Sequence, residues 1–101
     1  MLSDETPLPD SVDWVKAGKT TPIKDQGRCG SCWAFAAVSS VESAHAIRDN
    51  DLVALSEQQL VECDRDRNKG CQGGLASYAY LYLVDHKAYT EADWPYTALD
   101  D

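Results

Sequence analysis

The chain has 101 residues, which is the length of one ordinary domain and long enough for a single hydrophobic core. Hydrophobic residues make up 44% and charged residues 26% of it, a balance typical of globular proteins. Asp and Glu number 17 against 9 Lys and Arg, and the formal net charge of -8 argues against nucleic acid or an anionic membrane surface as the main partner. We expect no membrane span and no signal peptide, because no sufficiently long apolar run is present.

The N-terminal third is predicted to be irregular. Residues 1–13 have the features of an extended arm, because two prolines push the residues before them out of the helical region. Trp14 and Val15 are expected to anchor this arm to the core. Residues 18–30 are rich in glycine and charged residues and have the composition of a loop.

A central helix is predicted over residues 32–48. This stretch contains neither Gly nor Pro, and its apolar residues recur at spacings of three and four. Ser31 is the predicted N-cap, and Asn50 followed by Asp51 is the predicted stop.

Two shorter helices are predicted further along. Ser56 and Gln59 fit a capping box that opens a helix over residues 57–63, and a polar loop follows over residues 64–70. A second helical pattern begins after two consecutive glycines, and the tail from residue 90 to 101 is expected to be irregular. The residues predicted to share one face of this last helix are Leu75, Tyr78, Ala79, Tyr82 and His86.

The candidate reactive group is Cys32, which is predicted to open the central helix. The positive end of a helix dipole favours a thiolate, the nucleophilic form of cysteine. The backbone N–H of Cys32 is not used by the helix, and with the side-chain NH2 of Gln26 it would form a pair of donors for an oxyanion. Two nearby glycines, Gly27 and Gly30, leave room for a substrate backbone. These features indicate a nucleophilic cysteine.

The residues alone leave other interpretations open. A helical cysteine is usually a small buried hydrophobe, and Cys29 with Cys32 could form a redox pair resembling that of thioredoxin. Together with Cys63 and Cys71 these residues could supply four thiolates to zinc, although the second pair is spaced more widely than zinc sites usually have it. Nucleophile, redox pair and zinc site are therefore all compatible with the spacing.

A family resemblance narrows this choice. Residues 26–35, Gln-Gly-Arg-Cys-Gly-Ser-Cys-Trp-Ala-Phe, resemble the active-site segment of papain-family cysteine proteases, for which Cys-Gly-Ser-Cys-Trp is a known signature. Leu75 followed by Tyr78 is more similar to the cathepsin L branch than to the cathepsin B branch. Further blocks resemble the family in the same order, so the resemblance covers the chain from Leu8 onward: residues 8–14, 56–63, 70–74 and 94–96.

The resemblance implies a fold. We expect a mainly α structure, the N-terminal helical domain of the two-domain papain-like α+β fold, with its long central helix starting at the active-site cysteine. Residues 14–101 would form this domain, cut before the second, β-rich domain. Residues 1–13 would be the extended arm, and residues 1–7 the end of a pro-segment or a start added by cloning.

The resemblance also implies roles for individual residues. Cys32 would be the nucleophile, Gln26 would donate to the oxyanion, and Cys29 and Cys71 would form a disulfide beside the cleft. Cys63 would be left unpaired by truncation, because its family partner lies just past the end of this chain. Asp25, Arg28 and Glu42 are expected to serve structure. No metal and no cofactor is implied. The residues that would contact a peptide substrate are Gly30, Gly73, Gly74, Leu75 and Ala76.

The catalytic set is expected to be incomplete. A cysteine protease of this kind needs an imidazole to take and return a proton, and the family places its His and Asn about 130–150 residues after the cysteine, beyond residue 101. His45 lies on the same helix as Cys32 and about 20 Å from it. His86 falls on the apolar face of the last helix. We therefore predict that neither histidine is catalytic.

The leading hypothesis is a cysteine endopeptidase that cleaves peptide bonds through an acyl-enzyme, present here as a part with no activity of its own. The expected partners are a peptide or protein substrate, a missing C-terminal domain or second chain that supplies His and Asn, and a pro-segment or cystatin-like inhibitor. Localisation by family analogy is lysosome-like or extracellular. The alternatives are a non-enzymatic half-domain that docks on a complementary chain, and a thiol–disulfide redox protein.

Overall fold

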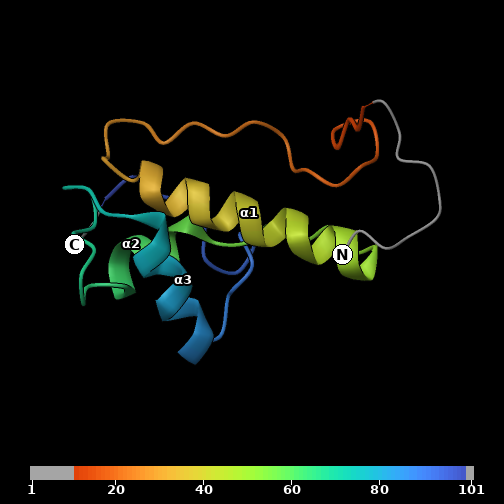
Figure 1. Cartoon of the computed structure of the whole chain (residues 1–101). Coiled ribbons are helices and arrows are strands. Elements are labelled where there is room, and N and C mark those ends of the chain that lie inside the picture. The colour runs from red at the N-terminus through yellow and green to blue at the C-terminus, as the bar shows by residue number, and fades with distance from the viewer. Residues whose placement is uncertain (1–10, 100–101) are drawn as a thin grey trace.

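The computed structural model describes residues 11–99, and these residues form a helical fold (Figure 1). Its helices are α1 (Cys32–Asp49), α2 (Glu57–Cys63) and α3 (Ala76–Asp85). The described part of the chain contains no strand, only two isolated bridges, Gly30 with Gln72 and Leu55 with Thr90. The predicted mainly α domain is confirmed, and α1 and α2 match their predicted bounds to within one residue.

The core lies where α2 and α3 pack against the first half of α1. Ala34 and Ala37 are fully buried, and such small side chains let neighbouring helices approach α1 closely. Partly buried residues from the loops, Tyr96 among them, complete the cluster. The buried members are Cys29, Trp33, Ala34, Ala37, Val38, Leu60, Val61 and Ala79.

The segment before α1 runs back along that helix (Figure 1). The Lys19 ammonium donates to Asn50 Oδ1 at the far end of α1 over 2.6 Å. Thr21 and Lys24 donate to Glu42 in the middle of the helix. The polypeptide therefore arrives at the N-terminal end of α1 already tied to its side.

The two ends of α1 stop in different ways. Asn50 adopts the left-handed conformation at a φ of 56° and donates its N–H to the Ala46 carbonyl, the predicted C-terminal stop. Ser31 holds the N-cap position, but its side chain does not cap the helix. That part of the prediction is wrong, because the Ser31 hydroxyl bonds to the Tyr96 hydroxyl instead.

Half of the predicted capping box of α2 is formed. Ser56 Oγ accepts the backbone N–H of Gln59 over 3.0 Å. The return bond is absent, because the Ser56 N–H donates to the Tyr89 carbonyl and the Gln59 amide bonds the backbone of Lys87 and Tyr89. Tertiary contacts with the segment after α3 have replaced the local bond.

The helix α3 starts at Ala76, after the two glycines that were predicted to precede it. Of its predicted apolar face only Ala79 is fully buried, whereas Leu75 is exposed. The described residues form no helix that is both long enough and apolar enough to cross a membrane.

The N-terminal arm is described only in part, since residues 1–10 lie outside the described range. Trp14 and Val15 do not anchor it, and that expectation is wrong: they are 46% and 73% exposed. They form a tight turn in which Gly18 and Lys19 donate to the carbonyls of Val15 and Trp14, and this turn leaves both side chains in solvent.

Candidate active site

Cys32 is the first residue of α1, and its free thiol is exposed. The first helical hydrogen bonds come from the N–H groups of Ala34 and Phe35, which donate to the Ser31 carbonyl. The N–H of Cys32 precedes them and so is not used by the helix. An exposed sulfur and an unused N–H donor therefore belong to the same residue.

A disulfide fixes the chain just before Cys32. Cys29 and Cys71 are joined with their Cα atoms 4.5 Å apart, as the resemblance implied. The Gly30 N–H donates to the Cys71 carbonyl over 2.9 Å, and a Cβ on Gly30 would lie 2.6 Å from that oxygen. The two loops can meet this closely only because residue 30 is a glycine.

Trp33 fixes the chain just after Cys32. Its side chain is 3% exposed, and its indole N–H donates to the Gly70 carbonyl over 3.0 Å. Gly74 packs on the same indole, since a Cβ there would lie 3.0 Å from Trp33 Cγ and 2.4 Å from Asn68 Oδ1. The loop over residues 70–74 is therefore held against the start of α1 from both sides of Cys32.

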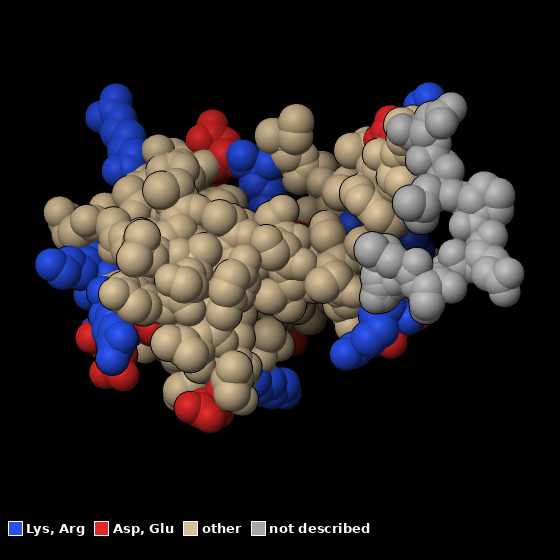
Figure 2. Space-filling model, viewed as in Figure 1, with Lys and Arg blue, Asp and Glu red and all other residues tan. Residues whose placement is uncertain are grey.

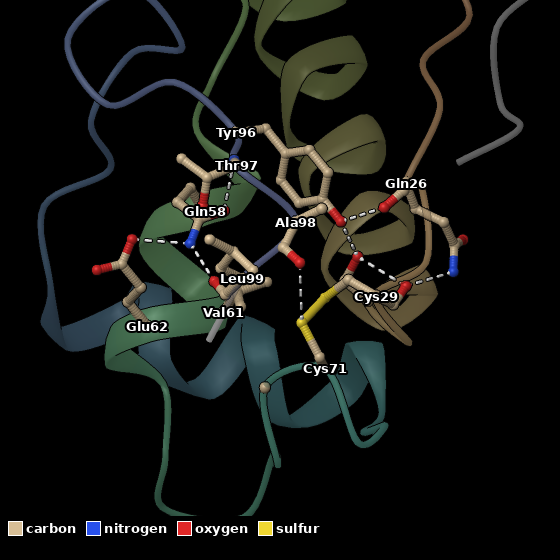
Figure 3. The surroundings of a disulfide bond; sticks show 12 residues. Gln26, Cys29, Gln58, Val61, Glu62, Cys71, Tyr96, Thr97, Ala98 and Leu99 are labelled. Atoms are coloured by element: carbon tan, nitrogen blue, oxygen red, sulfur yellow. Dashed lines mark hydrogen bonds between the residues drawn. A yellow bond between two sulfur atoms is a disulfide. The ribbon is translucent and has the colours of Figure 1, made fainter. Parts of the chain in front are cut away.

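Gln26 lies in the loop before the disulfide (Figure 3). Its side-chain NH2 donates one hydrogen to the Cys29 carbonyl over 2.8 Å, and a carboxamide has a second hydrogen to give. The turn beside it is closed by Asp25, whose carboxylate accepts the Gly27 N–H over 2.8 Å. Asp25 thus serves structure, as expected.

A buried ionic cluster supports α1 behind the site. Glu42 is 2% exposed and accepts bonds from the Thr21 hydroxyl, the Lys24 ammonium and the Leu55 N–H. Lys24 also donates to Glu57 at the start of α2 over 2.6 Å. Glu42 therefore serves structure, as expected, by joining α1 to the segment before it and to α2.

Burial governs the titration of this cluster. It raises the pKa of Glu57 to about 7, a rise that Lys24 opposes and the neighbouring Glu91 carboxyl increases. Burial would lower the pKa of Lys24, but its hydrogen bonds to Glu57 and Glu42 outweigh this and raise it. One carboxylate oxygen each of Glu57 and Glu91 is buried without a partner among the described residues.

The predicted substrate-contacting residues lie near the Cys32 end of α1. Gly30 pairs with Gln72, which precedes Gly73, in an isolated parallel bridge. Gly73 has a φ of 110°, where glycine is favoured, and its carbonyl accepts the Lys69 N–H. Leu75 is 55% exposed, and Ala76, the first residue of α3, is partly buried.

His45 lies 13 residues after Cys32 on α1, and His86 lies at the end of α3. His45 pairs with Asp49 over 3.1 Å and with Asp51 over 3.4 Å near the C-terminal end of the helix. His86 caps α3, stacks on the Tyr82 ring with centroids 4.0 Å apart, and its Nδ1 lies 2.9 Å from the Tyr82 carbonyl. Both imidazoles thus have local structural partners.

The disulfide also bears on the alternative interpretations of the cysteines. Cys29 is bonded to Cys71 and not to Cys32, so the predicted redox pair is not the disulfide that forms. The same bond uses two of the four sulfurs that a four-thiolate zinc site needs. The described residues contain no cluster of three or more His, Cys, Asp or Glu side chains suited to a metal ion.

Two residues of the site were not predicted from spacing. Tyr96 contacts the Gln26 loop and Ser31, although the sequence predicts only an irregular tail in this region. Asn68 is 2% exposed; it donates to Asp64 and accepts the Leu75 N–H, and so it shapes the loop around Gly74. Neither lies on a periodic face, and only the block resemblance around residues 94–96 pointed to Tyr96.

Comparison with known proteins places the chain in a family. The model of the papain family cysteine proteases matches residues 8–101. The chain is 52% identical over 94 residues to a probable cysteine protease RD21B of Arabidopsis thaliana, covering 92% of this chain and 20% of that protein. It is equally similar over 94 residues to vignain of Ricinus communis, covering 92% of this chain and 26% of that one.

Solved structures agree. A Carica candamarcensis cysteine protease, CMS1MS2, in complex with E-64 superimposes with a TM-score of 0.88 at 39% identity, covering 93% of this chain and 44% of that chain. The proform of the ragweed pollen cysteine protease Amb a 11 also gives 0.88, at 47% identity over 98% of this chain and 31% of that chain. The chain spans about a quarter or less of the length of RD21B and of Ricinus communis vignain. It belongs to the papain family of cysteine proteases.

Proposed function

We propose that this chain carries the nucleophile and the oxyanion donors of a cysteine endopeptidase. The observation that carries the proposal is the exposed Cys32 thiol on the first residue of α1, next to an N–H that the helix does not use. The thiolate would attack the carbonyl carbon of a peptide bond. The negative charge on the carbonyl oxygen would be held by the Cys32 N–H and the free hydrogen of the Gln26 amide.

The proton transfers need a residue from elsewhere. An imidazole must take the thiol proton and then protonate the amine as the C–N bond breaks, which leaves an acyl-enzyme on Cys32 sulfur. Water then attacks the thioester, so that the acid is released and the thiol regained. His45 and His86 are engaged with Asp49, Asp51 and Tyr82. We infer that a second domain or chain supplies the His and the Asn.

Substrate would bind as an extended peptide across the loop at residues 73–76. Gly74 is the better backbone partner, because the Gly73 carbonyl is already used by Lys69. Leu75 would offer an exposed apolar wall to one substrate side chain. Gly30, which is partly buried and held by Cys71, would allow the substrate backbone to approach Cys32 closely.

A two-part experiment tests the proposal. The 101-residue chain is assayed on a dipeptidyl fluorogenic substrate, and so is a chimera in which it replaces the matching segment of Ricinus communis vignain. We expect no cleavage by the chain alone and cleavage by the chimera that Cys32→Ser abolishes. Gln26→Ala in the chimera should lower kcat by about 10²–10³-fold, as the loss of one oxyanion donor does.

Two results would contradict the proposal. Cleavage by the isolated chain, lost on Cys32→Ser, would show that no second domain is needed. A chimera that unfolds cooperatively, and so is folded, but has no activity would show that Cys32 is not a working nucleophile in this setting. Unmodified vignain, processed in parallel, is the control for assay and refolding.

A second candidate is a non-enzymatic half-domain that docks on a complementary chain, a pro-segment or a cystatin-like inhibitor. Exposed apolar side chains favour it: Ile23 is fully exposed, and Val15 and Val84 are more than 70% exposed. Figure 2 shows a broad uncharged surface with Lys, Arg, Asp and Glu around its margin. Tight binding of the isolated chain to the second domain of vignain, with no activity of the complex, would favour docking over catalysis.

We infer a lysosome-like or extracellular location for the working protein. The Cys29–Cys71 disulfide supports it, because structural disulfides form and persist in oxidising compartments and are rare in the cytosol. Fractionation of cells that express the complete protein, followed by thiol labelling, tests this location. A cytosolic pool with both cysteines reduced would contradict it.

A further inference from the structure

The hydroxyl of Tyr96 contacts two residues that precede Cys32, and Figure 3 shows its bond to one of them, Gln26. It donates to the backbone carbonyl of Gln26, which lies 70 residues earlier in the chain. It also lies 2.8 Å from the hydroxyl of Ser31, 65 residues earlier. A single side chain from the C-terminal segment thus contacts both the Gln26 loop and the residue before the nucleophile.

The direction of these bonds follows from the hydrogen count. A tyrosine hydroxyl has one hydrogen, and that hydrogen goes to the Gln26 carbonyl. The Ser31 hydroxyl therefore donates to Tyr96 Oη over 2.8 Å, a closer acceptor than the Cys29 carbonyl at 3.5 Å, which shares its one hydrogen. The result is a short chain of hydrogen bonds from Ser31 through Tyr96 to Gln26, and it uses the serine hydroxyl that would otherwise cap α1.

The ring of Tyr96 is fixed as well. It meets the Phe35 ring of the first turn of α1 edge to face, with centroids 4.9 Å apart and an interplanar angle of 82°. Its backbone N–H donates to Glu91, and the N–H of Thr97 donates to the Gln58 amide of α2. Ser56, the N-cap of α2, donates to the Trp94 carbonyl nearby. The hydroxyl is therefore held in place by two helices.

We propose that Tyr96 is a positioning residue for the reaction assigned to Cys32: its hydroxyl locks the Gln26 carbonyl and the Ser31 side chain together. The two proposed oxyanion donors, the Gln26 amide and the Cys32 N–H, are then kept in a fixed relative position. The inference rests on the proposed function, because it concerns the same site. Tyr96 itself touches no reacting atom.

The test compares Tyr96→Phe with the unchanged sequence in the 101-residue chain, with Cys63→Ser in both so that Cys32 is the one free thiol. Tyr96→Phe keeps the ring against Phe35 and removes only the hydroxyl. Two readouts are measured: hydrogen exchange of the loop amides of Gly27, Gly30 and Ser31, and the rate of Cys32 alkylation by iodoacetamide across pH. Neither readout requires peptidase turnover.

We expect the loop amides to exchange up to about tenfold faster. The reason is that the net contribution of one hydrogen bond to stability corresponds to a factor of about two to ten in the opening equilibrium. The Val38 amide in the middle of α1 should exchange as before. The alkylation rate below pH 7 should fall several-fold, because the N–H groups beside the Cys32 sulfur would be less well ordered. The NMR signals of the Gln26 side-chain NH2 should shift.

A double-mutant cycle with Ser31→Ala separates positioning from general stability. If Tyr96 acts through Ser31 and Gln26, the two substitutions together should change the alkylation profile less than the sum of their separate effects. The control is Tyr80→Phe, which removes a hydroxyl from an exposed tyrosine of α3 and should change neither readout. If Tyr96→Phe does not fold, Ser31→Ala decides the matter with the same two readouts.

The proposal is overturned if Tyr96→Phe leaves the exchange of Gly27, Gly30 and Ser31 unchanged. It is equally overturned if exchange rises uniformly along α1 while the alkylation profile stays the same, because that is the signature of a merely structural residue. An inactive chimera would count against the proposed function alone, since the hydrogen-bond tie is measured without turnover.

Discussion

The two free cysteines are exposed thiols at opposite ends of helices. Cys32 is the first residue of α1, and Cys63 is the last residue of α2. A helix N-terminus carries partial positive charge and favours an anion, whereas a C-terminus disfavours one. Exposure is therefore shared by the two thiols, and the backbone that surrounds them makes the difference.

The chain on either side of the two cysteines is held by different contacts. Cys29, Ser31 and Trp33 around Cys32 are at most 3% exposed. Cys63 is followed by a polar loop and lies at the rim of an open hollow, where its thiol neighbours the Tyr82 hydroxyl. Burial of neighbouring residues does not separate the two thiols, because Val61 and Asp64 beside Cys63 are 0% and 3% exposed. The chain around Cys32 is instead fixed on one side by the Cys29–Cys71 disulfide and on the other by the bond from the Trp33 indole to Gly70, as a preorganised nucleophile needs.

Loss of the Trp33 ring should have the largest effect, because this ring fixes the chain around Cys32 and Cys63 has no counterpart to it among the described residues. Trp33→Ala removes a buried ring together with its bond to Gly70, and we expect about 3–5 kcal/mol of destabilisation in urea unfolding. Ile47→Ala, which removes a 47% exposed side chain near the end of α1, is the control and should cost much less. A loss of under 1 kcal/mol for Trp33→Ala would mean that the start of α1 is not held by this ring.

Removing the disulfide should be the next largest effect. Cys29→Ala with Cys71→Ala opens a loop with a sequence separation of 42, for which chain entropy gives about 4 kcal/mol. Cys63→Ala serves as the control and should leave stability nearly unchanged. Equal unfolding midpoints for the double variant and the unchanged chain would contradict a structural role for the bond.

The support behind Cys32 should depend on pH. The pKa of Glu57 in the folded chain, about 7, lies above its usual value of 4.5. Its stabilising contribution is therefore complete below about pH 4.5 and is lost as pH rises through 7, by up to about 3 kcal/mol. Urea midpoints between pH 4.5 and 7.5 should fall for the unchanged chain and stay level for Glu57→Gln. The control Asp66→Asn, at an exposed position, should keep the slope.

Asn68 connects the two regions and gives the smallest expected effect. It donates to Asp64, next to Cys63, and accepts the N–H of Leu75 beside the loop that packs on Trp33. Asn68→Ala leaves that N–H unpaired and should cost about 1–3 kcal/mol. Lys69→Ala, at the exposed neighbouring position, should change the free energy of unfolding by no more than about 0.5 kcal/mol. Equal losses of stability for the two variants would show that the Asn68 side chain does not hold this loop.

Much of the fold and part of the site could be predicted from the sequence. Spacing located α1 and α2, because apolar periodicity and a capping serine are local signals. The bond of the Ser31 hydroxyl to Tyr96 and the bond of Tyr96 to the Gln26 loop could not be found in this way. They depend on partners many residues away in the chain, such as Gln26 for Tyr96.

The central claim is that the helix end that carries Cys32 and the contacts that fix the chain around it, and not its exposure, distinguish it from Cys63. It is tested most directly by the rates at which iodoacetamide alkylates Cys32 and Cys63 in the oxidised 101-residue chain at pH 6, followed by peptide mass mapping. The account predicts that Cys32 reacts at least about tenfold faster, because it lies at a helix N-terminus and Cys63 at a helix C-terminus. Equal rates, or faster labelling of Cys63, would contradict it.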